Sequence, residues 1–151
     1  MTMQNNLTTE AILDPLKFPL SGSRLIEASA GTGKTWTIAA LYLRFILGHD
    51  PALGDRQDFA RAKLPAEILV MTFTRAATRE LSERIRDRLN EAAQYFRGEI
   101  LEQGEDPFLK SLRADYPEGT LRDHAGWRLA MAAESMDEAA VHTIDAWCQR
   151  M

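Results

Sequence analysis

The sequence predicts an α/β fold in which helices flank a parallel sheet, because short apolar runs alternate with helical segments along the chain. Three runs carry this prediction: residues 23–27, 67–73 and 139–141. The first leads directly into a glycine-rich turn, and the second is an aliphatic stretch typical of a parallel strand covered on both faces. A segment that favours a helix follows each run, so strands and helices are expected to alternate.

The first two helices have clear periodicity. Residues 34–47 repeat apolar side chains at helical spacing, and Gly48 stands where a C-terminal cap belongs. Residues 75–96 place apolar side chains at every fourth position, on one side of a helix. These apolar residues are Ala77, Leu81, Ile85, Leu89 and Ala93.

The remaining segments predict a loop and further helices. Residues 48–65 mix Pro, Gly, Asp and Arg without periodicity, which indicates a surface loop. Helices are expected over residues 107–114 and 121–136, with a short one from Ile144 to the end. Residues 100–136 either pack on the sheet or begin an inserted helical accessory region.

Bulk composition limits the class of protein. With 151 residues, of which 45% are hydrophobic, residues 1–151 are expected to form one compact unit. The formal net charge of −4 argues against a generally basic coat, so any contact with nucleic acid needs a local cluster of cations. The single cysteine, Cys148, excludes an internal disulfide. No apolar stretch approaches the ~20 residues that span a bilayer, so a soluble, cytoplasmic protein is expected.

Residues 28–35 match the phosphate-loop pattern G-x-x-x-x-G-K-[ST] at every fixed position except the first, where Ala28 replaces glycine. Small residues let backbone N–H groups surround a phosphate, Lys34 would reach the β- and γ-phosphates, and the Thr35 hydroxyl would bind Mg²⁺. Lys34 and Thr35 are therefore the expected catalytic residues, and Thr35 the expected metal ligand. The expected nucleotide-binding residues are Ala28, Ser29, Ala30, Gly31, Thr32, Gly33, Lys34 and Thr35.

Three motifs resemble those of one helicase family. Residues 25–42 closely resemble the first motif of RecB-type helicase-nuclease subunits, in which alanine is normal at the first loop position. Residues 68–81 resemble motif Ia of UvrD-like superfamily-one DNA helicases, and residues 140–149 resemble a third RecB motif that usually reads T-I-H-G-F-C. The resemblance implies a P-loop NTPase (RecA-like) fold and an amino-terminal fragment containing part of the first helicase motor domain.

The resemblance also implies a function. Family members use ATP and Mg²⁺ to move 3′ to 5′ on single-stranded DNA, in RecBCD-like helicase-nuclease complexes that act in double-strand break repair and recombination. The implied partners are single-stranded and duplex-end DNA together with RecC-like and RecD-like subunits. In this family motif Ia and the third motif line the DNA path at the carboxyl ends of the strands. The DNA-binding residues carried over are Thr72, Phe73, Thr74, Arg75, His142 and Thr143.

Each of these residues also has an ordinary structural interpretation. Phe73 could be a core residue, and Thr143 could be only a helix N-cap. The arginines of residues 75–88 alternate with acids, as on a solvated helix face. His49 and His124 have no partner at metal-ligand spacing and are expected at the surface.

The acidic motif needed for hydrolysis is not evident. The only Asp-Glu pair, Asp137 and Glu138, follows no buried strand and is expected to end a helix. The fragment alone is therefore expected to be inactive. Two alternatives stay open: a stand-alone UvrD-like or AddA-like helicase, and a small P-loop kinase or nucleotide-binding regulator.

Overall fold

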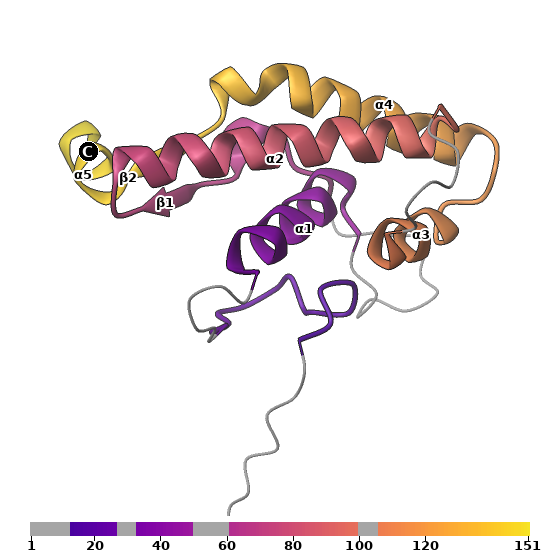
Figure 1. Ribbon diagram of the computed structural model, residues 1–151, viewed down its shortest axis with the longest axis horizontal. Coiled ribbons are helices and arrows are strands. Elements are labelled where there is room, and N and C mark those ends of the chain that lie inside the picture. The colour runs from indigo at the N-terminus through magenta and orange to yellow at the C-terminus, as the bar shows by residue number, and fades with distance from the viewer. Residues whose placement is uncertain (1–12, 27–32, 50–60, 100–105) are drawn as a thin grey trace, which may run out of the picture.

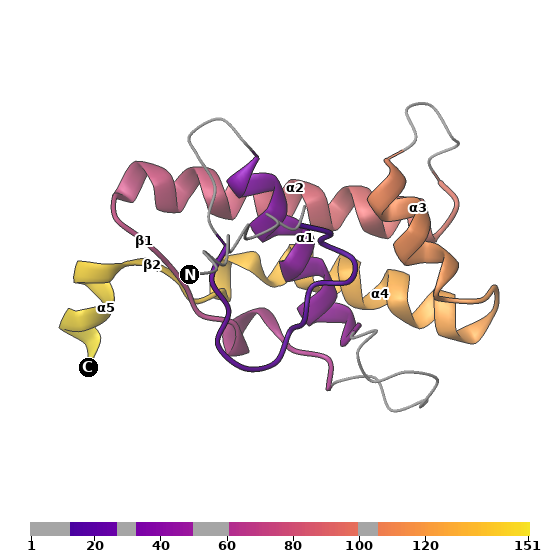
Figure 2. The ribbon, with the colours of Figure 1, turned by 90° about the horizontal axis from the view of Figure 1, so that it is seen from below.

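The computed structural model describes residues 13–26, 33–49, 61–99 and 106–151 (Figure 1). Its elements follow in the order α1 (Lys34–Leu47), η2 (Pro65–Glu67), β1 (Val70–Thr72), α2 (Arg75–Phe96), α3 (Pro107–Ala114), α4 (Thr120–Glu134), η3 (Ser135–Glu138), β2 (Val141–Thr143) and α5 (Ile144–Arg150). The long helix α2 is central, because it contacts α1, α3, α4 and both strands. Helix α4 runs alongside it, the strands lie near its first turn, and α3 lies toward its far end (Figures 1 and 2).

Local capping signals fix the helix bounds. Helix α1 ends as expected at Gly48, whose φ of 70° is readily adopted by glycine. Helix α2 begins after Thr74, whose side-chain oxygen accepts a hydrogen bond from the Ala77 amide at 3.1 Å. Asp106 caps α3 by accepting from the Phe108 amide at 2.9 Å. The predicted bounds of α1, α2 and α3 are thus confirmed, and the helix expected over residues 121–136 divides into α4 and the 3₁₀ turn η3.

The strand predictions were less accurate. Residues 23–26 form no strand, and Glu27 lies outside the described residues. The strand expected over residues 67–73 is only Val70–Thr72. It is not covered on both faces either, since Met71 is 48% exposed. A strand exists only where a partner offers hydrogen bonds, and the partner here, β2, is itself three residues long.

The two strands pair in parallel. Val70 lies opposite Val141, Met71 opposite His142, and Thr72 opposite Thr143. Within the described ranges the sheet has these two strands, so the structure is a helix-rich α/β arrangement. Because the strands are parallel and in register, both carboxyl ends meet at one edge, where α2 and α5 begin.

The hydrophobic core lies between α1, α2, α3 and α4. Ile85 and Leu89 of α2 are fully buried, together with Leu43 of α1 and Leu129 of α4. Of the other three residues in the predicted apolar stripe on α2, Leu81 and Ala93 are buried, whereas Ala77 is exposed. The helices therefore pack mainly on one another. No helix among the described residues is long and apolar enough to span a membrane.

His49 is buried, contrary to the surface position expected for it. It is 2% exposed, and its Nδ1 accepts a hydrogen bond from Arg44 Nε at 3.1 Å. With Nδ1 accepting, Nε2 carries the proton and donates to Asp115 Oδ2 at 2.7 Å. His49 thus joins the end of α1 to the end of α3, and His124 is exposed as expected.

Candidate functional site

The carboxyl-terminal end of the predicted phosphate loop forms the start of α1. Gly33 is the N-cap residue and has a φ of 83°, a left-handed conformation that side chains disfavour. Lys34 is exposed, Thr35 is half-buried, and the first turn of α1 contains no acidic residue. These features suit an anion, because the first amides of a helix lack intrahelical partners and carry partial positive charge. The predicted residues Ala28, Ser29, Ala30, Gly31 and Thr32 lie outside the described residues.

The start of α1 is braced against α2. The guanidinium of Arg88 lies 5.5 Å from the centroid of the Trp36 ring and 5.9 Å from that of Phe108. It also forms ion pairs with Asp106 and, at 2.8 Å, with Glu91. Since Trp36 directly follows Thr35, this cluster fixes the first turn of α1 relative to α2.

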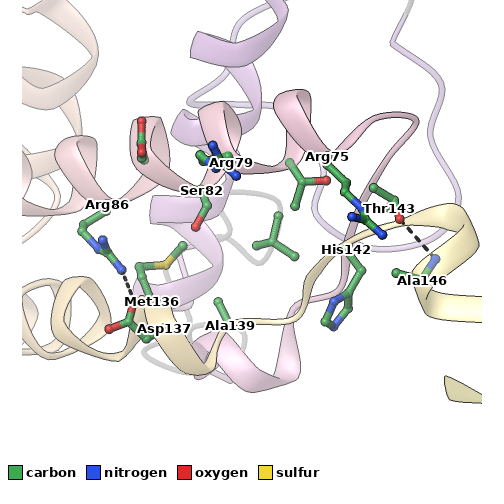
Figure 3. Close-up of a pocket in the computed structure, with 13 residues that line it drawn as sticks. Arg75, Arg79, Ser82, Arg86, Met136, Asp137, Ala139, His142, Thr143 and Ala146 are labelled. Atoms are coloured by element: carbon green, nitrogen blue, oxygen red, sulfur yellow. Dashed lines mark hydrogen bonds and ion pairs between the residues drawn. The ribbon is translucent and has the colours of Figure 1, made fainter.

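A groove of about 470 Å³ lies between the first half of α2 and the segment from η3 to α5 (Figure 3). It brings together three of the residues expected to bind DNA, namely Arg75, His142 and Thr143. The other residues that line it are Thr78, Arg79, Ser82, Glu83, Arg86, Met136, Asp137, Ala139, Val141 and Ala146. Residues from motif Ia and from the third motif therefore face one hollow, although more than 60 residues of sequence separate Arg75 from His142.

The other three expected DNA-binding residues lie beside the groove rather than in its lining. Thr72 and Thr78 are hydrogen-bonded through their hydroxyl oxygens, and the Thr72 hydroxyl also donates to the Thr74 carbonyl at 3.1 Å. Thr74 caps α2. Phe73 is 89% exposed, so the interpretation as a core residue is wrong for this part of the chain. These contacts hold the turn between β1 and α2 so that the Phe73 ring projects outward.

On the third motif, Thr143 and His142 are held locally. Thr143 is the N-cap of α5 and accepts a hydrogen bond from the Ala146 amide at 3.1 Å. The ordinary interpretation of Thr143 as a cap is therefore confirmed. The His142 ring stacks on Trp147, with 6.0 Å between centroids and 22° between planes. Arg150 Nη1 lies 3.4 Å from His142 Nε2, so α5 orients this imidazole.

The sequence pattern did not predict the part of the groove formed by the middle of α2. Arg79, Ser82 and Arg86 line it, yet their alternation with acidic residues suggested only a solvated face. The signal that could have found them is spacing, because they lie four, seven and eleven residues after Arg75, on the same side of a helix. Arg86 is paired with Asp137 of η3 at 2.5 Å.

Comparison with known proteins gives a consistent result. A protein-family model described as UvrD/REP helicase N-terminal domain matches residues 8–151. The RecBCD enzyme subunit RecB of Escherichia coli (strain K12) is 48% identical over 139 residues, which cover 92% of this chain and 11% of that protein. The RecB subunit of Haemophilus influenzae is 40% identical over 144 residues, again covering 92% of this chain and 11% of the relative. The RecB subunit of Mycobacterium tuberculosis (strain ATCC 25618 / H37Rv) is 33% identical over 140 residues, covering 91% and 11%. The chain thus spans 11% of the length of these relatives.

Proposed function

This chain belongs to the UvrD/REP helicase N-terminal domain family, and on that premise we propose that it is the ATP-binding part of the first motor domain of a RecB-like helicase subunit. The full-length protein would use ATP to translocate 3′ to 5′ on single-stranded DNA within a helicase-nuclease complex for double-strand break repair and recombination. RecC-like and RecD-like subunits would be its partners, in the cytoplasm. Residues 1–151 would be part of a P-loop (RecA-like) domain, with residues 100–136 either packed within it or opening an accessory region.

One observation carries the proposal: the parallel register of β1 and β2 brings motif Ia and the third motif to a single edge. Ligands of open α/β sheets bind outside the carboxyl ends of the strands. At this edge Arg75 supplies a cation, His142 and Thr143 supply hydrogen-bonding groups, and Phe73 presents an exposed ring. This set can hold a sugar-phosphate backbone and stack a base without reading sequence, as a translocating motor requires.

The start of α1 would hold the nucleotide. Lys34, on the exposed first turn, would bind the β- and γ-phosphates, and Thr35 would bind Mg²⁺ through its hydroxyl. ATP with Mg²⁺, when bound, supplies the free energy of phosphoryl transfer to water. The residues of this chain contribute binding, orientation and charge.

This stretch alone is not expected to hydrolyse ATP. Hydrolysis needs an Asp that holds Mg²⁺ and a Glu that activates water, both placed at the end of a buried strand. Asp137 and Glu138 are exposed on η3. Neither carboxylate therefore stands at the end of a buried strand, and Asp137 forms an ion pair with Arg86.

The experiment is strand separation by the full-length protein that carries this chain, assembled with its partner subunits. Duplexes with a single-stranded 3′ tail and with a 5′ tail are compared in the presence of ATP and Mg²⁺, with a block on any nuclease activity. To isolate this subunit, the Lys34→Ala complex is compared with the wild type. The proposal predicts that loading on the 3′ tail gives unwinding that Lys34→Ala abolishes. A Lys34→Ala complex that retains the same unwinding would contradict it.

A further inference from the structure

Four groove-lining residues form a single stripe along α2: Arg75, Arg79, Ser82 and Arg86 (Figure 3). Their spacings of four, three and four residues place them on one face of the helix. At 1.5 Å of rise per residue, Arg75 and Arg79 are separated by roughly 6 Å along the helix axis. This separation is comparable to the distance between successive phosphates in an extended single strand.

The arginines of this stripe differ in whether they are paired with an acidic residue. Neither Arg75 nor Arg79 makes an ion pair within the part of the chain that the structure describes, although Glu83 also lines the groove. Arg86, in contrast, pairs with Asp137 at 2.5 Å. Two adjacent cations are therefore available at the sheet end of the groove, while an ion pair closes its other end.

Resting on the proposed function, we propose that Arg79 is an additional DNA-binding residue. Its guanidinium binds the phosphate adjacent to the one held near Arg75. The single-stranded DNA therefore runs from the carboxyl ends of β1 and β2 along α2 toward Ser82. A planar guanidinium with several fixed donors matches phosphate oxygens well, and the Ser82 hydroxyl can donate to the same backbone. The groove then contacts more than one nucleotide of the single-stranded DNA.

Affinity for single-stranded DNA as a function of salt tests the assignment. The full-length complex is titrated into fluorescein-labelled oligothymidylate without nucleotide, and anisotropy gives Kd at several KCl concentrations. Each phosphate contact contributes about 0.7 to the slope of log K against log salt for single strands. Arg79→Gln should therefore lower the magnitude of this slope by about 0.7 and weaken binding most at low salt.

Arg84→Gln is the matched control. Arg84 lies on the same helix, is exposed and does not line the groove, so the same loss of charge should leave the slope unchanged. Arg79→Lys keeps the charge and should restore most of the slope. An Arg79→Gln slope equal to that of the wild type, or an equal loss in Arg84→Gln, would overturn the assignment while leaving the proposed function intact. Failure of the wild-type complex to bind the oligonucleotide would overturn both.

A second measurement requires no variant. Phenylglyoxal modifies accessible arginines, and peptide mass spectrometry reports each site separately. Oligothymidylate should protect Arg75 and Arg79 together, leaving Arg84 reactive. Protection of Arg75 without Arg79 would contradict the proposed path.

Discussion

The guanidinium of Arg88 lies 5.5 Å from the centroid of the Trp36 ring, and this contact joins the middle of α2 to the first turn of α1. The Arg88 side chain is 10% exposed and its partner Asp106 is 21% exposed, so the pair is largely shielded from water. Asp106 also caps α3. One arginine thus links three helices around the start of the predicted nucleotide site.

Replacing Arg88 with methionine should destabilise the fold. The substitution preserves much of the aliphatic volume but leaves the Asp106 carboxylate without its cation, at a cost of roughly 1–3 kcal/mol. Urea unfolding followed by circular dichroism measures this change. Arg84→Met on the same helix is the control and should change stability by less than about 0.5 kcal/mol. Equal stabilities for the two variants would show that the cluster contributes nothing.

The buried hydroxyl of Tyr42 should make the folded protein less stable at alkaline pH. Burial raises the pKa of the Tyr42 hydroxyl from 10.0 to about 12. The folded state therefore keeps a proton that the unfolded state releases, so stability falls as pH rises from about 10 toward 12. Burial also raises the pKa of Tyr116, which acts in the same direction.

Tyr42→Phe should reduce this alkaline loss. The Tyr42 hydroxyl is buried without a hydrogen-bond partner among the described residues, so removing it should be neutral or stabilising near neutral pH. Denaturant midpoints measured between neutral and alkaline pH test both points. A Tyr42→Phe curve that falls as steeply as the wild type would indicate that another group controls the transition.

Phe73→Ala should weaken DNA binding without unfolding the protein. The ring is 89% exposed, so its removal sacrifices little packing. Loss of one stacked base is expected to cost about 1–3 kcal/mol of binding free energy. Anisotropy with labelled oligothymidylate measures the binding, and thermal melting measures the fold. Trp127→Ala removes another exposed aromatic, which is on α4 and outside the groove, and should bind normally.

The sequence was most informative where structure depends on neighbouring residues. Gly48, Thr74 and Thr143 act within a few residues of their helix ends, and the bounds of α1, α2 and α5 follow from them. Strands depend on distant partners, which is why the strand expected over residues 23–27 was wrong in its described part and β1 is shorter than expected.

Contacts between residues far apart in the sequence explain the other differences between the predictions and the structure. His49 is buried because Asp115, 66 residues away, accepts its hydrogen bond, and no local pattern indicates this. In the groove, the resemblance identified Arg75, His142 and Thr143, but the position of Arg79 depends on η3 and β2, which face α2 from a distant part of the sequence. The role of residues 28–32 in phosphate binding stays a prediction.

Lys34 is the residue through which the start of α1 is proposed to bind the phosphates of ATP in a DNA-dependent motor. The measurement is ATP hydrolysis by the full-length subunit, separated from its partners, with and without single-stranded DNA. We predict that DNA stimulates hydrolysis by the wild type and that Lys34→Ala abolishes it, whereas Lys17→Ala, at another exposed lysine, hydrolyses normally. DNA-stimulated hydrolysis by Lys34→Ala at the wild-type rate would show that Lys34 does not bind the phosphates of ATP.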